Sequence, residues 1–411
     1  MNLPTQLLER RVRRSAFAVR ALLLAACAAL AASCGGGVDS GGTGAPVSSY
    51  ASGPITGFGS VIVNGVRFDD RSATVRDGDG NARNRDELRL GMSTDVRGTA
   101  IIPDSTGASI STATDIVFAS EIVGRLTSND LAARRLVVQA QGVDIAATTV
   151  FDDALVGGQA ALAVGDTIEV YGHVDASTGR YAATRIERKT GVAAYVLRGI
   201  VRNLDTAAKS FSIGAVRISY TSLAANAVPA TLANGQFVRA VLALAAGPGG
   251  TLVALRLGDG TPSVDDREEA RVRGLVSAFT SSTSFSVNGT PVDARNAQFP
   301  RGSAGLALGV RVEVEGATTG GVLVATRVTL LIDGGGGGGG DDELDVSGLI
   351  TSLDTVGRNF VVRGVTVGYS GTVDFRNGTA ADLAIGREVE ARGTLSADGT
   401  RLQATRIDIH R

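Results

Sequence analysis

The chain of 411 residues contains few of the side chains that most catalytic mechanisms require. It has no Trp, two Cys, two His and two Lys, and aromatic residues make up only 4% of it. Metal and nucleophilic mechanisms need clusters of such groups, and neither His173 nor His410 has a Cys or carboxylate at ligand spacing. We therefore expect that the protein is not an enzyme and carries no cofactor.

Positive charge is concentrated at the N-terminus. Residues 1–33 carry five Arg and one Glu, which leaves 35 basic and 40 acidic residues, a net charge of −5, in the rest of the chain. Neutralisation of phosphates supplies most non-specific affinity for nucleic acids, and this acidic remainder has no basic stripe. We expect no nucleic-acid partner.

The first 33 residues have the pattern of a secretory signal peptide. An Arg-rich stretch ends at Arg20 and is followed by thirteen uncharged, mostly apolar residues, 21–33. A helix that spans a bilayer needs about 20 such residues, so a cleaved signal peptide is favoured over a permanent transmembrane helix. This pattern predicts export from the cytoplasm.

The residues before each Cys resemble a bacterial lipobox, in which the Cys after the cleavage site receives lipid. Residues 24–26 before Cys27 are closer to the usual pattern, but cleavage there leaves an apolar region shorter than the ~7–15 residues that signal peptides need. We therefore predict lipidation at Cys34, with Cys27 as the alternative and an ordinary cleaved signal as a further one. By the same resemblance, Gly35 after the Cys points to the outer membrane, on its periplasmic side or at the cell surface.

One small unit recurs five times along the rest of the chain. A strand-like segment with a Gly recurs at intervals of 67, 75, 75 and 74 residues, at Gly57, Gly124, Gly199, Gly274 and Gly348. In four units a later Gly begins a strand that ends at a second Gly seven residues on, the pairs being Gly91 and Gly98, Gly165 and Gly172, Gly309 and Gly316, and Gly386 and Gly393. In the third unit Gly235 is present but Leu242 replaces its partner.

Each unit has the pattern of about five short strands. Apolar residues alternate with polar ones, Gly, Asp and Ser separate the runs, and no comparable segment has a helical period. We expect an all-β chain of five tandem five-stranded barrels of the oligonucleotide/oligosaccharide-binding type, with glycines at their bulges and Phe211, Phe285 and Phe360 in their cores. The expected organisation is a signal peptide (1–33), a flexible Gly/Ser tether (34–52), β repeats at 53–121, 122–190, 194–260, 268–333 and 343–411, and a poly-Gly linker at 334–342.

The order of the motifs, FxVxG followed by LxxGxxVxVxG and AT(R)I, resembles the bacterial domain-of-unknown-function family numbered 5666, which occurs in tandem in proteobacterial lipoproteins. The resemblance covers nearly all of residues 53–411 and is strongest in units two, four and five. The family has no assigned activity or catalytic residues, so it implies a fold and a location. The poly-Gly linker before the fifth unit indicates that this unit is the most independent.

Two acidic segments are candidates for chemistry. Asp77, Asp79 and Asn81 place oxygen ligands at alternate positions, as a Ca²⁺ loop does, but Ala82 and Leu88 stand where an EF-hand needs Gly and Glu. A solvated turn is the favoured interpretation, and we predict no metal site. The pairs Asp69–Asp70 and Asp152–Asp153 would serve acid/base chemistry only if both members of a pair lined one cleft.

These features together predict a non-enzymatic, lipid-anchored protein of the cell envelope. Five copies on one tether would give avidity toward a repeating surface or periplasmic ligand, such as a cell-surface polymer. The alternative is a structural or assembly role, in which the repeats act as a spacer and dock on another envelope protein by strand addition.

Overall fold

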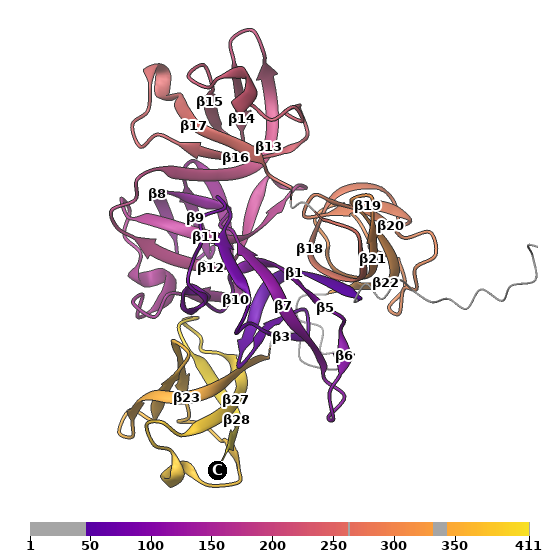
Figure 1. The fold of residues 1–411 in the computed structure, drawn as a ribbon. Coiled ribbons are helices and arrows are strands. Elements are labelled where there is room, and N and C mark those ends of the chain that lie inside the picture. Colours follow the sequence, from indigo (N-terminus) through magenta and orange to yellow (C-terminus); the bar gives the residue numbers. More distant parts are fainter. Residues whose placement is uncertain (1–46, 262–263, 332–342, 411) are drawn as a thin grey trace, which may run out of the picture. The chain divides into compact units, whose positions relative to one another are not determined.

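The computed structural model describes residues 47–261, 264–331 and 343–410. The signal peptide, Cys27, Cys34, most of the tether and the poly-Gly linker lie outside these ranges. The described residues form strands joined by turns and short 3-10 segments (Figure 1). Among them no helix is long and apolar enough to cross a membrane.

The elements follow the five repeats of the sequence. The first repeat contains β1 (Ser48–Phe58), β2 (Val61–Val63), β3 (Val66–Asp69), β4 (Thr74–Asp77), η2 (Arg85–Glu87), β5 (Ser93–Thr99), β6 (Ile102–Pro103) and β7 (Ser109–Phe118). The second contains β8 (Ile122–Asp130), β9 (Arg135–Val138), β10 (Gln141–Phe151), η3 (Gly158–Ala161), β11 (Thr167–Asp175) and β12 (Arg180–Lys189). The third contains β13 (Tyr195–Asp205), β14 (Ser210–Ile213), β15 (Val216–Ser219), η4 (Ala225–Ala227), β16 (Phe237–Leu242), η5 (Pro248–Gly250) and β17 (Leu252–Asp259). The fourth contains β18 (Arg267–Ser281), β19 (Ser284–Val287), β20 (Thr290–Asp293), β21 (Arg311–Thr319) and β22 (Val322–Leu330). The fifth contains β23 (Leu344–Asp354), β24 (Asn359–Val362), β25 (Val365–Gly368), β26 (Asp374–Arg376), η6 (Ala380–Asp382), β27 (Glu388–Leu395) and β28 (Leu402–Ile409).

Strand pairing closes each repeat into a small barrel. In the third repeat β13 pairs antiparallel with β14 and β16, and β14 pairs antiparallel with β15. The barrel closes because β15 pairs parallel with β17, which pairs antiparallel with β16. The other four repeats have the same connectivity, so the predicted all-β architecture of five-stranded barrels is confirmed.

Alternating burial places the apolar side of each strand inside its barrel. In β16, for example, Val238, Ala240 and Leu242 are buried and the residues between them are partly exposed. The three Phe expected in cores, Phe211, Phe285 and Phe360, are 1%, 4% and 0% exposed. Because these rings fill the barrels, they are not available as stacking surfaces for a ligand.

The second glycine of each recurring pair lies at a β-bulge. The register between the fourth and fifth strands shifts at Gly98, Gly172, Gly316 and Gly393, and also at Leu242 in the third repeat. A Cβ on Gly316 would lie 2.1 Å from the carbonyl oxygen of Val324 on the facing strand. The predicted role of these glycines is confirmed, since they let two backbones approach closely where the barrel bends.

We expect Gly316→Ala to lower the free energy of unfolding by about 1–3 kcal/mol, the range for overpacked sites. Gly258→Ala is the matched control, because a Cβ there meets nothing within 4 Å, and its effect should stay within about 0.5 kcal/mol. Urea unfolding of both variants measures the difference. Equal stabilities would show that the bulge does not depend on glycine.

Hydrogen-bonded strands also join one repeat to another. β1 pairs parallel with β18 of the fourth repeat and with β23 of the fifth, and β8 pairs antiparallel with β13. One hydrophobic core contains residues of the first and fifth repeats together, and a second core contains residues of the second and third. The described repeats are therefore packed against one another.

Two expectations about independent segments need correction. The tether was expected to extend to Ser52, but Ser48–Ser52 belong to β1, where Tyr50 and Ala51 are 1% and 0% exposed. The fifth repeat was expected to be the most independent, yet it shares a core with the first. The length of a linker does not decide whether the repeats that it joins separate. Apolar burial between the first and fifth repeats favours their association.

Candidate functional site

Two neighbouring cavities, which share Thr56 and Arg273 in their linings, lie between the repeats. The first chamber, which we call the apolar chamber, has a volume of about 280 Å³ and is lined by residues of the first, second, fourth and fifth repeats. Its apolar wall includes Ile55, Val150, Ala183, Leu344 and Leu395. This volume is close to the lower end of the ~300–1,000 Å³ typical of small-molecule sites.

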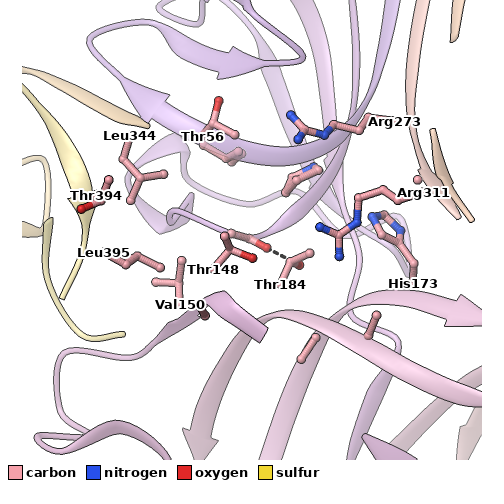
Figure 2. A pocket seen from close by; sticks show the side chains of 17 residues that line it. Thr56, Thr148, Val150, His173, Thr184, Arg273, Arg311, Leu344, Thr394 and Leu395 are labelled. Atoms are coloured by element: carbon pink, nitrogen blue, oxygen red, sulfur yellow. Dashed lines mark hydrogen bonds between the residues drawn. The ribbon is translucent and has the colours of Figure 1, made fainter. Parts of the chain in front are cut away.

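One side of the apolar chamber is basic. Figure 2 shows Arg273, Arg311 and His173 on that side, with Leu344, Leu395 and Val150 opposite them. Arg273 lies on β18 and Arg311 begins β21, which pairs with β18. His173 follows the bulge at Gly172 on β11, which contacts β18 here. Strand pairing thus holds all three side chains in place.

The two arginines that precede a repeat glycine differ in their partners. Arg198 and Arg273 occupy equivalent positions, before Gly199 and Gly274. Arg198 donates from Nη1 to both carboxylate oxygens of Glu121, at 2.8 and 2.9 Å. No ion pair joins Arg273 to any residue in the described part of the chain, although its side chain is partly buried. Glu313 is the cross-strand neighbour of Arg273 and lines only the polar chamber, so the apolar chamber itself offers this guanidinium no carboxylate.

The imidazole of His173 is held neutral. Its residue is 8% exposed, and burial, followed by the charges of Arg311, Arg198 and Arg273, lowers its pKa to about 3. At neutral pH the ring therefore offers one N–H donor and one nitrogen acceptor to the chamber. The positive charge of this side comes from the arginines alone.

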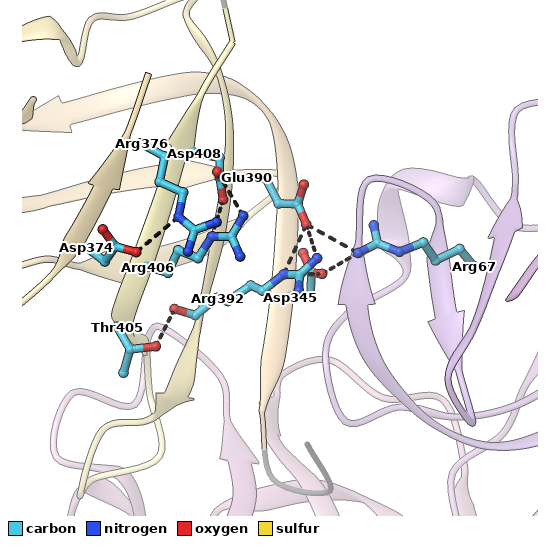
Figure 3. Close-up of polar contacts among 9 residues, drawn as sticks. All are labelled: Arg67, Asp345, Asp374, Arg376, Glu390, Arg392, Thr405, Arg406 and Asp408. Carbon is cyan, nitrogen blue, oxygen red and sulfur yellow. Dashed lines mark hydrogen bonds and ion pairs between the residues drawn. The ribbon is translucent and has the colours of Figure 1, made fainter. Parts of the chain in front are cut away.

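The second chamber, the polar chamber, has a volume of about 420 Å³ and shares Thr56 and Arg273 with the first. Figure 3 shows its ionic network, in which Arg67 of the first repeat contacts Asp345 at 2.5 Å and Glu390 at 3.3 Å. Arg392 lies 3.2 Å from Asp345 and 2.6 Å from Glu390. Burial first, opposed by Arg67 and assisted by Glu390, raises the pKa of Asp345 to about 6.

The Arg67 network fastens the fifth repeat to the first. We expect that, after cleavage at a protease site inserted in residues 334–340, the fragment 343–411 stays bound to the rest of the chain. Arg67→Glu places a third carboxylate beside Asp345 and Glu390, so that variant should release the fragment. Gel filtration after cleavage measures this, and release of the fragment from the unsubstituted chain would show that the repeats are separate beads.

The predicted acidic loop has a role between repeats. Asp77 Oδ1 accepts hydrogen bonds from the backbone N–H groups of Asp79 and Asn81, which closes the turn. The Asp79 carboxylate pairs with Arg239, at 3.1 Å, and with Arg256, both in the third repeat. Among the residues that the structure describes, no group of three or more His, Cys, Asp or Glu could hold a metal ion.

The two carboxylate pairs differ in their surroundings. Asp69 binds the exposed Arg71, whereas Asp70 is 1% exposed and binds Arg363 at 2.9 Å, so these two do not share a cleft. Asp152 and Asp153 both line a separate cavity of about 260 Å³. Burial raises the pKa of Asp153, and Asp152 Oδ1 accepts the N–H of Ala154 in a turn. The other histidine, His410, is exposed at the end of β28.

Comparison with known families agrees with the barrel motifs. Residues 123–187, 273–329 and 347–408 match a family described as a domain of unknown function (DUF5666). The chain carries tandem DUF5666-like domains. The matched segments fall in the second, fourth and fifth repeats, where the resemblance was expected to be strongest. No curated protein matches the chain.

The DUF5666-like motifs predict the barrels but do not predict which residues line the two chambers. The residues of the apolar chamber come from four repeats, and the sequence period reports contacts only within a repeat. The residue before the first-strand glycine differs between the repeats and is Thr56, Val123, Arg198, Arg273 or Ser347. Thr56 and Arg273 from this set line both chambers.

Proposed function

We propose that the protein is a non-enzymatic, lipid-anchored ligand-binding protein of the bacterial cell envelope, and that its ligand binds in the apolar chamber. The observation that supports this is the composition of the apolar chamber, whose lining comes from four repeats. Concave sites with an apolar wall and a few convergent polar groups are the usual form of small-molecule sites. The packed repeats would then be the means of building one site.

The earlier expectation of multivalent binding gives a different use of the same scaffold. It requires an equivalent free face on each repeat, whereas the described repeats bury parts of their barrels against one another. Docking on a partner envelope protein requires an unpaired strand edge. Binding experiments on the intact chain separate these functions from the proposed one.

The test is retention of small molecules by the intact chain. Ala147 is exposed and lines the apolar chamber, so Ala147→Trp should block it without disturbing a barrel core. We expect native mass spectrometry after incubation with an envelope extract to show a bound small molecule on the unsubstituted protein and none on the variant. Equal retention by both, or retention of polymer alone, would contradict the proposal.

The anchor is tested separately. We expect Cys34→Ala to abolish incorporation of a labelled fatty acid and to release the protein from the membrane fraction, since the acylated Cys would be its only attachment. Cys27→Ala is the matched control and should leave labelling unchanged. Labelling that persists in the Cys34 variant would contradict lipidation at this residue.

A further inference from the structure

We infer that the apolar chamber binds a small monocarboxylate with an apolar chain, whose carboxylate pairs with Arg273. This inference rests on the proposed function and specifies the chemical class of the ligand. It follows from the distribution of charge around the chamber, the partners of its arginines and the nature of the opposite wall.

The basic side selects an anion. Arg273, Arg311 and the neutral His173 line it, and no Asp or Glu lines this chamber. The equivalent arginine of the third repeat, Arg198, has Glu121 as its partner, whereas Arg273 has no ion-pair partner among the described residues. A guanidinium binds a carboxylate through two parallel hydrogen bonds, which makes that group the best match for Arg273.

The opposite side selects an apolar chain. Leu344, Leu395 and Val150 face the basic side across the chamber, as Figure 2 shows, and Ile55 and Ala183 also belong to the lining. A ligand that spans the chamber therefore has a charged end and an apolar end. Thr148 also lines the chamber, and its hydroxyl can donate a further hydrogen bond to a carboxylate.

The volume limits the size of the ligand. About 280 Å³ lies just below the ~300–1,000 Å³ typical of small-molecule sites, so the chamber suits a small ligand. Inorganic phosphate would satisfy the arginine but leave the apolar wall uncovered. A short chain that ends in one carboxylate uses both sides.

The experiment is calorimetric titration of the mature chain with straight-chain carboxylates from acetate to decanoate. Alcohols and alkylamines of the same lengths and inorganic phosphate serve as comparison probes. We expect affinity for the carboxylates to rise by about four-fold per added methylene until the wall is covered. Alcohols should bind at least about ten-fold more weakly, and amines and phosphate should give no measurable heat.

Substitution of Arg273 tests the carboxylate contact. Arg273→Gln should weaken carboxylate binding by about ten-fold or more. Arg273→Lys should have an intermediate affinity, because it keeps the positive charge but cannot form the two parallel hydrogen bonds of a guanidinium. Both variants should keep the melting temperature, since Arg273 makes no ion pair in the described structure. Arg327→Gln, at an exposed position of the same repeat that lines neither chamber, should leave affinity unchanged.

The outcomes separate this inference from the proposed function. Alcohols or amines that bind as well as carboxylates, with binding lost in Ala147→Trp, would overturn the carboxylate assignment and leave the ligand-binding function standing. An unchanged carboxylate affinity in Arg273→Gln would do the same. Absence of binding by every probe, together with an Ala147→Trp variant that retains envelope molecules normally, would overturn both.

Discussion

Arg198→Met is expected to lower the free energy of unfolding by about 3–5 kcal/mol, because it removes the ion-pair partner of the buried Glu121 carboxylate. The side chains of Arg198 and Glu121 are only 10% and 6% exposed. The same guanidinium donates to the carbonyl oxygens of Gly260 and Asn288 and lies 4.7 Å from the centre of the Phe237 ring. Arg198 of the third repeat thus contacts both Glu121, at the junction of the first and second repeats, and the fourth repeat.

A double variant distinguishes the buried charge from simple loss of packing. Replacing both partners with apolar residues of similar size, as in Arg198→Met with Glu121→Leu, should recover most of the lost stability, since buried ion pairs are often replaceable in this way. Urea unfolding of the two single variants and the double variant gives the coupling energy. A loss below about 1 kcal/mol in Arg198→Met would show that Glu121 finds another partner.

The pH dependence of the Arg198→Met variant provides a second measurement. Burial already raises the pKa of Glu121, while Arg198 opposes that increase. Without Arg198 the folded-state pKa rises further above its unfolded value, so protonation relieves the cost of the buried charge as pH falls. The loss in free energy of unfolding that Arg198→Met causes should therefore be smaller at pH 5 than at pH 7.

Acidification should destabilise the unsubstituted protein through His173. Burial first and then three arginines lower its folded-state pKa to about 3, against 6.5 for an unperturbed imidazole. Between these values the unfolded chain holds a proton that the folded chain does not, so stability is lost as pH falls below about 6.5. The slope approaches about 1.4 kcal/mol per pH unit, or about 2 kcal/mol between pH 6.5 and pH 5.

Two variants isolate this contribution. His173→Gln should remove the slope, and His410→Gln, at an exposed position, should leave it unchanged. Asp345 acts in the opposite direction, because its raised pKa of about 6 makes the folded chain take up a proton first as pH falls below 6. Asp345→Asn should therefore make the free energy of unfolding fall more steeply between pH 6 and pH 4. An equal slope in His173→Gln and the unsubstituted protein would contradict the assignment.

The sequence was sufficient to predict the barrels because their determinants are local. Alternating apolar residues define the strands, and a glycine at a fixed distance defines each bulge, as at Gly172 and Gly316. Leu242 shows that the pattern tolerates an exception, since the bulge forms there without glycine. Repetition of these local rules identified the architecture before any contact between repeats was known.

The candidate site could not be predicted because its contacts connect different repeats. Arg273 and Arg311 come from the fourth repeat, His173 from the second and Leu344 from the fifth. No spacing rule relates such residues, since their proximity depends on how whole barrels pack. For the same reason Asp79 had the pattern of a turn or metal ligand when its role is an ion pair with another repeat.

β1 is hydrogen-bonded to strands of three repeats, which bears on how the chain would respond to a pulling force. It is hydrogen-bonded to β5 of its own barrel and to strands of the fourth and fifth repeats, and it begins 14 residues after Cys34. In a chain attached to a membrane through Cys34, any pull on the attachment would reach β1 first. Its long antiparallel ladder with β5 would resist that load in shear, with many hydrogen bonds sharing it at once. The strand nearest the attachment would then protect the barrels behind it from being unfolded one by one.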